Sequence, residues 1–198
     1  MLQGSSISSA MDLNIRTLSR ASPRPCKPVS SKEVVWQPPR LGCIKLNIDG
    51  SSFGSPSSGA VGVVIRDWEN NFLGGFAQNI GHASAFVAEL SAAMFAIEKA
   101  VEMHWGDVWI ETNSLMVLKA LYHQLEVPWM LRVRWLNCIA LTQTFTCNFS
   151  HIHREGNAVA DALAKNGLNL PSLHSQWWLD PPHFILPLLQ RDSIDFFA

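Results

Sequence analysis

The stretch CIKLNIDG, residues 43–50, contains the pattern from which the fold of this chain can be worked out. Apolar side chains occupy every second position of it, at Ile44, Leu46 and Ile48, and mostly polar side chains occupy the positions between them. A period of two predicts a β-strand with one face in a core. Asp49 ends this strand, and a carboxylate in that position requires partners, because burying an unpaired charge is costly.

Two more strands follow without an intervening helix. The stretch GAVGVVIRD, residues 59–67, is almost continuously apolar, which predicts a central strand covered on both faces. After the polar turn WENN, residues 68–71, the stretch NFLGGFAQNI predicts a third strand. Three consecutive strands joined by short connections predict an antiparallel meander.

The hydrophobic period then changes from that of a strand to that of a helix. A stripe formed by Leu90, Met94, Ile97 and Val101 predicts a helix that begins after an N-cap at Ser84. A strand, two helices, a strand and a last helix follow, over about 108–112, 114–122, 129–141, 144–152 and 157–166. The order βββ-α-β-α-α-β-α predicts an α/β fold, in which a five-stranded mixed sheet begins with three antiparallel strands and is flanked by helices.

Composition divides the chain into three parts. Residues 1–35 contain much Ser, Pro and Arg, show no hydrophobic period, and are expected to be disordered. Residues 36–168 contain every predicted strand and helix and are expected to form one domain. Residues 169–198 form a tail with apolar and aromatic side chains and several Pro, which is expected to pack on the domain as irregular chain.

The bulk composition excludes several classes of protein. With 47% hydrophobic and 16% charged residues the chain is globular, and its net charge of −1 gives no general attraction to nucleic acid, so such binding requires a local patch. The four cysteines form no C-x-x-C pair, which favours reduced thiols in an intracellular protein. No apolar run is long enough to span a membrane. The N-terminus shares traits with organelle transit peptides, but a linker is favoured, so a nuclear or cytoplasmic location is expected.

Five polar residues fall at the ends of predicted strands and the starts of predicted helices: Asp49, Glu89, Glu111, Asn113 and Asp161. Such positions meet at one end of an α/β sheet, where these folds place their sites. Taken singly, each acid also has a structural explanation, since an acid in the first turn of a helix, as at Asp161, is favoured by the macrodipole. Taken as a set, the carboxylates fit a hard cation such as Mg²⁺, and two such ions can hold the attacking and leaving oxygens of a phosphodiester.

Five motifs in this order resemble a type 1 ribonuclease H domain, and most of all the plant branch related to the ribonuclease H of non-LTR retrotransposons. They are KLNIDGSS, GAVGVVIRD, AELSAAMFAIEKA, WIETNS and FSHIHREGNAVADALA. The resemblance covers about residues 36–167 and implies a five-stranded mixed sheet flanked by helices. It also implies hydrolysis of the RNA strand of an RNA–DNA hybrid by two Mg²⁺ or Mn²⁺ ions, with no small-molecule cofactor, by a chain that works as a monomer.

The resemblance also assigns the site residues. The metal ligands it implies are Asp49, Glu89, the residue at position 113, and Asp161. The nucleic-acid contacts it implies are Gly50, Ser51, Ser52, Asn157 and Arg154, of which the first three lie where the family meets 2′-hydroxyl groups. Asn157 is also expected to cap the last helix. Arg66, Arg154 and Lys165 are candidates for a local basic patch, and His151 and His153 are interpreted as structural.

Asn113 departs from the family pattern, which has Asp in E-x-D-S. The exchange is nearly isosteric, but it removes a negative charge and leaves a neutral carbonyl oxygen as the possible ligand, which predicts weaker binding of the second ion. Glu111, two residues earlier on the same strand face, is a possible substitute. Three interpretations follow: a weakened ribonuclease H, a catalytically dead module that binds RNA–DNA hybrid or double-stranded RNA, and a retrotransposon relic without function.

Overall fold

The computed structural model of the chain describes residues 36–194. The predicted disordered segment, residues 1–35, lies outside the described residues. Among the described helices, none has the length and apolar composition needed to cross a membrane.

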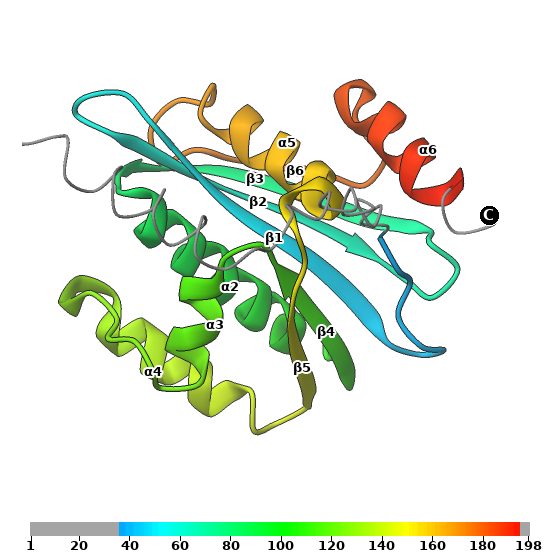
Figure 1. Cartoon of the computed structure of the whole chain (residues 1–198), viewed down its shortest axis with the longest axis horizontal. Helices are drawn as coiled ribbons and strands as arrows, with labels where there is room; N and C mark the ends of the chain where they lie inside the picture. Colours follow the sequence, from blue (N-terminus) through cyan, green and yellow to red (C-terminus); the bar gives the residue numbers. More distant parts are fainter. Residues whose placement is uncertain (1–35, 195–198) are drawn as a thin grey trace, which may run out of the picture. The chain divides into compact units, whose positions relative to one another are not determined.

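The first three strands form the predicted antiparallel meander. They are β1 (Ile44–Phe53), β2 (Ser58–Arg66) and β3 (Phe72–His82), and each pairs antiparallel with the next. On the other side of β1 lie β4 (Asp107–Thr112) and β5 (Thr146–His151), both parallel to their neighbours. The sheet is therefore mixed, and β1 is the strand at which antiparallel pairing changes to parallel pairing (Figure 1).

The sheet has six strands, in the order β5-β4-β1-β2-β3-β6, so the expected number of five is wrong. The sixth strand, β6 (Ser175–Trp178), pairs antiparallel with β3 and comes from the tail. The expectation of an irregular tail is also wrong, because the tail continues through the short 3-10 helix η3 (His183–Ile185) into helix α6 (Leu186–Ile194).

Helices cover both faces of the sheet and create two apolar cores. On one face α2 (Ala85–Glu102), α3 (Leu115–Leu121) and α4 (Arg132–Leu141) pack over the larger core, which contains Leu46, Ile97 and Trp135. On the other face α5 (Ala158–Gly167) and α6 pack over a smaller core around Leu163 and Ile185. Short 3-10 turns, η1 (Trp129–Leu131) and η2 (Arg154–Asn157), precede α4 and α5. The helix α4 therefore begins later than predicted, whereas α5 begins directly after Asn157, as predicted.

Two glycines allow helices to approach the sheet closely. A Cβ built on Gly50, within β1, would lie 2.2 Å from the backbone N of Glu89 in α2. A Cβ built on Gly62, which pairs with Asp49 from β2, would lie 2.2 Å from the backbone N of Ala164 in α5. Since no real Cβ fits at such distances, glycine at these two positions determines how near α2 and α5 come to the sheet beside Asp49.

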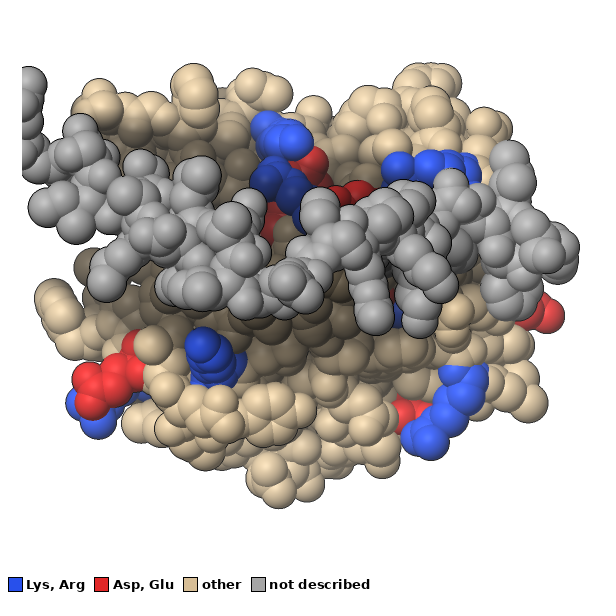
Figure 2. Space-filling view, viewed as in Figure 1, with Lys and Arg blue, Asp and Glu red and all other residues tan. Residues whose placement is uncertain are grey.

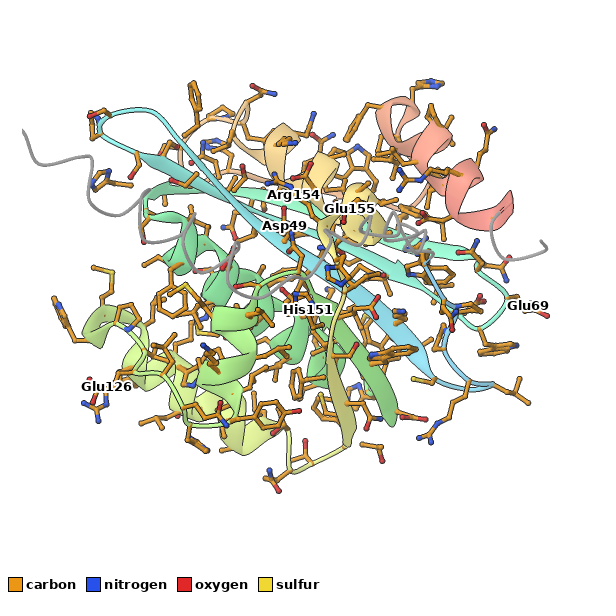
Figure 3. All side chains as sticks on the ribbon, in the orientation of Figure 1. Asp49, Glu69, Glu126, His151, Arg154 and Glu155 are labelled. Atoms are coloured by element: carbon orange, nitrogen blue, oxygen red, sulfur yellow. The ribbon has the colours of Figure 1, made fainter. Side chains whose placement is uncertain are left out.

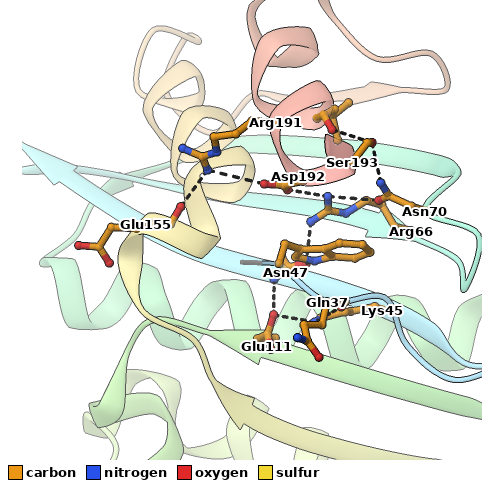
Figure 4. Close-up of polar contacts among 12 residues, drawn as sticks. Gln37, Lys45, Asn47, Arg66, Asn70, Glu111, Glu155, Arg191, Asp192 and Ser193 are labelled. Atoms are coloured by element: carbon orange, nitrogen blue, oxygen red, sulfur yellow. Dashed lines mark hydrogen bonds and ion pairs between the residues drawn. The ribbon is translucent and has the colours of Figure 1, made fainter. Parts of the chain in front are cut away.

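The face of β1 that was predicted to be polar is buried. Lys45, Asn47 and Asp49 are all nearly inaccessible, because Trp36, α5 and α6 lie over that side of the sheet. The buried cations on this side of the sheet are paired inside the molecule (Figure 4). Lys45 Nζ lies 2.8 Å from Glu111, and Arg66 of β2 lies 2.7 Å from Asp192 of α6. The alternation of β1 is therefore confirmed, but its polar half faces a buried charge network instead of solvent.

Candidate active site

Asp49 lies at the centre of the candidate site, where β1 passes between α2 and α5. The prediction that Asp49 ends its strand is wrong, because β1 continues to Phe53 and stays paired with β2. Its side chain is only 5% exposed. Burial, together with repulsion from the carboxylates of Asp161 and Glu89, raises the pKa of Asp49 to about 7, although the guanidinium of Arg154 acts in the opposite direction. Burial is the largest cause of this shift, and the two neighbouring carboxylates add to it, so the ionised form of Asp49 lacks both solvent and sufficient positive charge.

Glu89 reaches this place from α2, which the close approach at Gly50 permits. Its carboxylate accepts a short hydrogen bond from the hydroxyl of Ser114. Ser114 is also the N-cap of α3, because its Oγ accepts a hydrogen bond from the backbone N–H of Val117. Burial raises the pKa of Glu89, and the hydrogen bond from Ser114 opposes that shift. Ser114 therefore fixes the carboxylate of Glu89 to the start of α3.

Asp161 lies in the first turn of α5 and is held by two cations. Arg154 lies 2.8 Å from one carboxylate oxygen and Lys165 lies 2.5 Å from the other. Although burial opposes ionisation of Asp161, the hydrogen bonds from Lys165 and Arg154 outweigh it and lower its pKa. Arg154 lies beside Asp49 in the side-chain view (Figure 3) and lowers its pKa, so this exposed arginine acts on both Asp49 and Asp161.

Asn113 follows the end of β4 and is held by two neighbours. Its side-chain oxygen accepts a hydrogen bond of 3.3 Å from Nδ2 of Asn157, and its backbone oxygen lies 3.2 Å from Nε2 of His151. Asn157 also donates from Nδ2 to the backbone oxygen of Ile48, at 2.9 Å. Asn157 occupies the N-cap position of α5, as predicted, but its side chain makes no capping hydrogen bond. That side chain instead joins Ile48, within β1, to Asn113, which follows the end of β4.

Glu111 is occupied elsewhere. One of its oxygens lies 2.8 Å from Lys45 Nζ and accepts a hydrogen bond from Asn47, and the other accepts from Ser150. To reach a metal ion beside Asp49, Glu111 would have to leave Lys45 buried without a partner. These contacts argue against Glu111 as a substitute for the missing carboxylate.

The remaining sequence candidates fall into three groups. Gly50, Ser51 and Ser52 are partly exposed beside Asp49, as a contact surface requires. Arg66 is 1% exposed, so its expected place in a basic patch is wrong, because α6 covers it and Asp192 pairs with it. His151 and His153 stack edge to face with ring centroids 5.5 Å apart.

The acids make these protein contacts instead of converging on a single point. Across residues 36–194, no three His, Cys, Asp or Glu side chains are gathered closely enough to hold a metal ion in their present conformations. Asp161 is turned toward Arg154 and Lys165, and Glu89 is turned toward Ser114. A cation would have to draw both carboxylates toward Asp49, whose raised pKa supplies the electrostatic reason for it to bind there.

Sequence reasoning missed one residue of this site and one contact. Ser114 was not assigned as the partner of Glu89, and Asn157, although assigned to the site, was not assigned as the partner of Asn113. The last residue of the motif WIETNS was the available signal for Ser114. No local signal predicts the Asn113–Asn157 contact, because the two residues are far apart in sequence and meet only where β4 and α5 come together.

Comparison with known proteins agrees with this geometry. A family model described as reverse transcriptase-like matches residues 47–167. A protein of Arabidopsis thaliana whose name assigns it to ribonuclease H is 30% identical over 169 residues, which is 85% of this chain and 27% of that protein. Ribonuclease HI of Halobacterium salinarum is 31% identical over 137 residues, which is 68% of this chain and 69% of that protein.

Solved structures give the same result. The crystal structure of RNase H1 from Halobacterium salinarum matches with a TM-score of 0.58 and 28% identity, over 64% of this chain and 98% of that chain. LC11-RNase H1, solved in complex with an RNA/DNA hybrid, matches with a TM-score of 0.56 and 27% identity, over 64% of this chain and 96% of that chain.

The fold and the matched residues define a ribonuclease H-like nucleic-acid domain. This chain belongs to the ribonuclease H family. It spans about a quarter of the length of the Arabidopsis relative, so the activities of that longer protein are not transferred to it as a whole.

Proposed function

We propose that this chain binds RNA–DNA hybrids and hydrolyses their RNA strand slowly, with a divalent ion bound at Asp49, Glu89 and Asp161. The observation that carries the proposal is the close packing of α2, which bears Glu89, and α5, which bears Asp161, against β1 and β2 beside Asp49, where burial and the two neighbouring carboxylates raise the pKa of Asp49 to about 7. A single chain supplies all three acids, so the site requires no second copy.

The donor set fits a hard cation. Mg²⁺ and Mn²⁺ prefer carboxylate oxygens, and an ion placed between Asp49 and its neighbours would relieve the repulsion that raises the pKa of Asp49. When bound, such an ion supplies positive charge beside the phosphate and activates a water molecule. Asp49, Glu89 and Asp161 would hold it, while Ser114 and Arg154 orient two of these carboxylates.

The nucleic acid would lie over the partly exposed segment that follows Asp49. Gly50, Ser51 and Ser52 offer backbone groups and small hydroxyls, which suit recognition of 2′-hydroxyl groups without reading sequence. On the face drawn in Figure 2, charged side chains are few, and basic and acidic atoms adjoin one another. We therefore expect modest affinity that falls as salt is added. A relative, LC11-RNase H1, has been crystallised with an RNA/DNA hybrid, which supports the choice of ligand.

The test is cleavage of a labelled RNA–DNA hybrid by the purified chain and its variants, with Mg²⁺ or Mn²⁺. We expect slow cleavage by the wild type, none by Asp49→Asn and none in EDTA. Asn113→Asp should cleave at least about 10-fold faster, since groups that stabilise developing charge are commonly worth 10²–10³ in rate. Cleavage by the wild type that is no faster than by Asp49→Asn would remove the hydrolase from this proposal.

A second candidate function, binding of hybrid or double-stranded RNA without cleavage, is favoured by Asn113. The position that the family fills with a fourth acid holds a neutral side chain whose oxygen is already bonded to Asn157. If the wild type binds hybrid but does not cut it, while Asn113→Asp cuts, this candidate replaces the first.

A further inference from the structure

We infer that Asn113 turns its amide nitrogen toward the substrate side of the site and donates a hydrogen bond to a phosphate oxygen of the bound duplex. The inference rests on the proposed function, and it changes the role of position 113 from a weak metal ligand to a phosphate contact.

The orientation of Asn113 follows from its neighbour. The backbone oxygen of Ile48 can only accept a hydrogen bond, so the side-chain atom of Asn157 that lies 2.9 Å from it is the nitrogen. The same nitrogen lies 3.3 Å from the side chain of Asn113. Since Asn157 offers an N–H there, Asn113 must present its oxygen to it. The amide of Asn113 is thus oriented by a carbonyl that cannot change its role, which removes the usual ambiguity of amide side chains.

The amide nitrogen of Asn113 is left for a ligand. No hydrogen bond joins Nδ2 of Asn113 to any residue within 36–194, and this atom is not among the buried polar atoms of that region that lack a partner. It is therefore accessible, in a side chain that is only partly buried. Asn113 lies beside the acids, because the next residue, Ser114, bonds to Glu89, and its own partner, Asn157, bonds to the backbone oxygen of Ile48 next to Asp49. These acids would repel a phosphate, so an N–H donor beside them has a specific use.

This orientation of the Asn113 amide opposes binding of a second metal ion at position 113. An aspartate held in the same way by Asn157 would direct its second oxygen into the site, where it could bind a cation. Asparagine directs an N–H there instead, and an amide nitrogen has no lone pair to offer a metal. The chain therefore fits one ion held by Asp49, Glu89 and Asp161, and Asn113 opposes a second.

The first measurement is binding of an RNA–DNA hybrid in EDTA at low salt, by fluorescence anisotropy, with the full chain. Three variants separate the contributions: Asn113→Asp adds a charge, Asn113→Ala removes the donor without adding a charge, and Asn169→Ala removes an exposed amide at the far end of α5. If Asn113 donates to a phosphate, the wild type binds about 3–10-fold more tightly than Asn113→Ala. Asn113→Asp binds more weakly than both, and Asn169→Ala binds like the wild type.

If the wild type and Asn113→Ala bound the hybrid with equal affinity, the inference would be overturned and the proposed function would stand. Binding would then depend on the absence of a negative charge at position 113 and not on an N–H donor. Failure of the wild type itself to bind hybrid would overturn the proposed function, and the inference with it. Thermal unfolding of each variant identifies any that fails to fold.

The second measurement counts bound ions. It does not rely on a loss of affinity, which a variant that folds poorly would also show. Electron paramagnetic resonance of Mn²⁺, with a hybrid whose RNA strand is 2′-O-methylated and resists cleavage, gives the number of ions per chain. We expect one ion for the wild type and two for Asn113→Asp. Two ions on the wild type would overturn the statement that Asn113 excludes the second.

Discussion

Asp49 holds its carboxylate in a buried position next to two other acids, and this has a consequence for stability as well as for metal binding. Burial and the repulsion from Asp161 and Glu89 raise its pKa from 3.8 to about 7. Because the folded pKa is the higher one, the contribution of Asp49 to stability is fully present below pH 3.8 and is lost as the pH rises through 7. The whole shift corresponds to on the order of 4 kcal/mol.

We therefore expect Asp49→Asn to be more stable than the wild type at pH 8 in EDTA, by about 2–4 kcal/mol. The advantage should shrink steadily between pH 7 and pH 4, and Mg²⁺ should reduce it at pH 8, because the ion stabilises only the folded wild type. Urea unfolding across this pH range measures the difference. The control is Asp180→Asn, which changes an exposed acid and should show no such pH dependence. A constant advantage, or a less stable variant at pH 8, would refute the explanation.

At the scale of single residues, the sequence predicts which groups carry charge but not how that charge is balanced. Asp49, Glu89 and Asp161 were predicted from their positions at expected strand ends and helix starts, and the structure places Glu89 and Asp161 near Asp49, within β1. Their partners were not predictable. Arg66 was expected at the surface, yet its neutralising group, Asp192, lies 126 positions further along the chain. Pairing of side chains over such separations depends on the completed fold, which local patterns do not contain.

At the scale of elements, the contact between α2 and β1 depends on Gly50. We expect Gly50→Ala to destabilise the protein by about 2–3 kcal/mol, because the new Cβ would lie 2.2 Å from the backbone of Glu89 and would push the helix away. Gly106→Ala is the matched control, since a Cβ there meets nothing within 4 Å and the change should stay within about 0.5 kcal/mol. Chemical denaturation compares the two variants.

Gly50→Ala should also weaken Mn²⁺ binding, because Glu89 lies in the segment of α2 that has to move. Gly62→Ala tests the corresponding contact of α5, where a Cβ would lie 2.2 Å from Ala164. A Gly50→Ala variant with unchanged stability and unchanged metal affinity would show that the absence of a side chain at position 50 does not set the distance between α2 and β1.

Prediction of the tail failed for two reasons, of which one is that proline was taken as evidence against regular structure. Three of the four Pro of the tail, at positions 181, 182 and 187, suggested irregular chain. However, Pro182 precedes the turn η3, and Pro187 lies in the first turn of α6, where a helix needs no backbone N–H from it. The strand β6 was missed because four residues rich in Trp show no clear period. By contrast, the period change between β3 and α2, with the cap at Ser84, was sufficient to predict that helix.

At the scale of the whole molecule, a buried charge network joins the two ends of the described chain to the sheet. Trp36 lies 3.7 Å from Arg66 and donates a hydrogen bond to Asn47, while α6 contributes Asp192 to the same arginine (Figure 4). The family match ends at residue 167, so α6 lies beyond it. Arg66 nevertheless has no exposed route to solvent and needs Asp192 for neutralisation.

This arrangement makes α6 part of the folding unit, which a set of substitutions can test. We expect Asp192→Ala to destabilise the protein by about 3–5 kcal/mol, because it leaves the guanidinium of Arg66 buried without a counter-charge. Asp192→Asn, which keeps the size and an acceptor, should have a smaller effect. The double variant Arg66→Met with Asp192→Leu should be more stable than Asp192→Ala, since replacing both charges removes the unpaired one.

Urea unfolding of the wild type and these three variants gives the differences directly. Adding the single variants Arg66→Met and Asp192→Leu completes a double-mutant cycle, which gives the coupling energy of the pair. If Asp192→Ala had little effect on stability, α6 would have to move so that solvent reaches Arg66. The helix α6 would then pack on the domain without being needed to bury Arg66. The strength of this coupling decides where the domain ends: a large value means that the ribonuclease H-like sheet of this chain is complete only with the helix that follows residue 185.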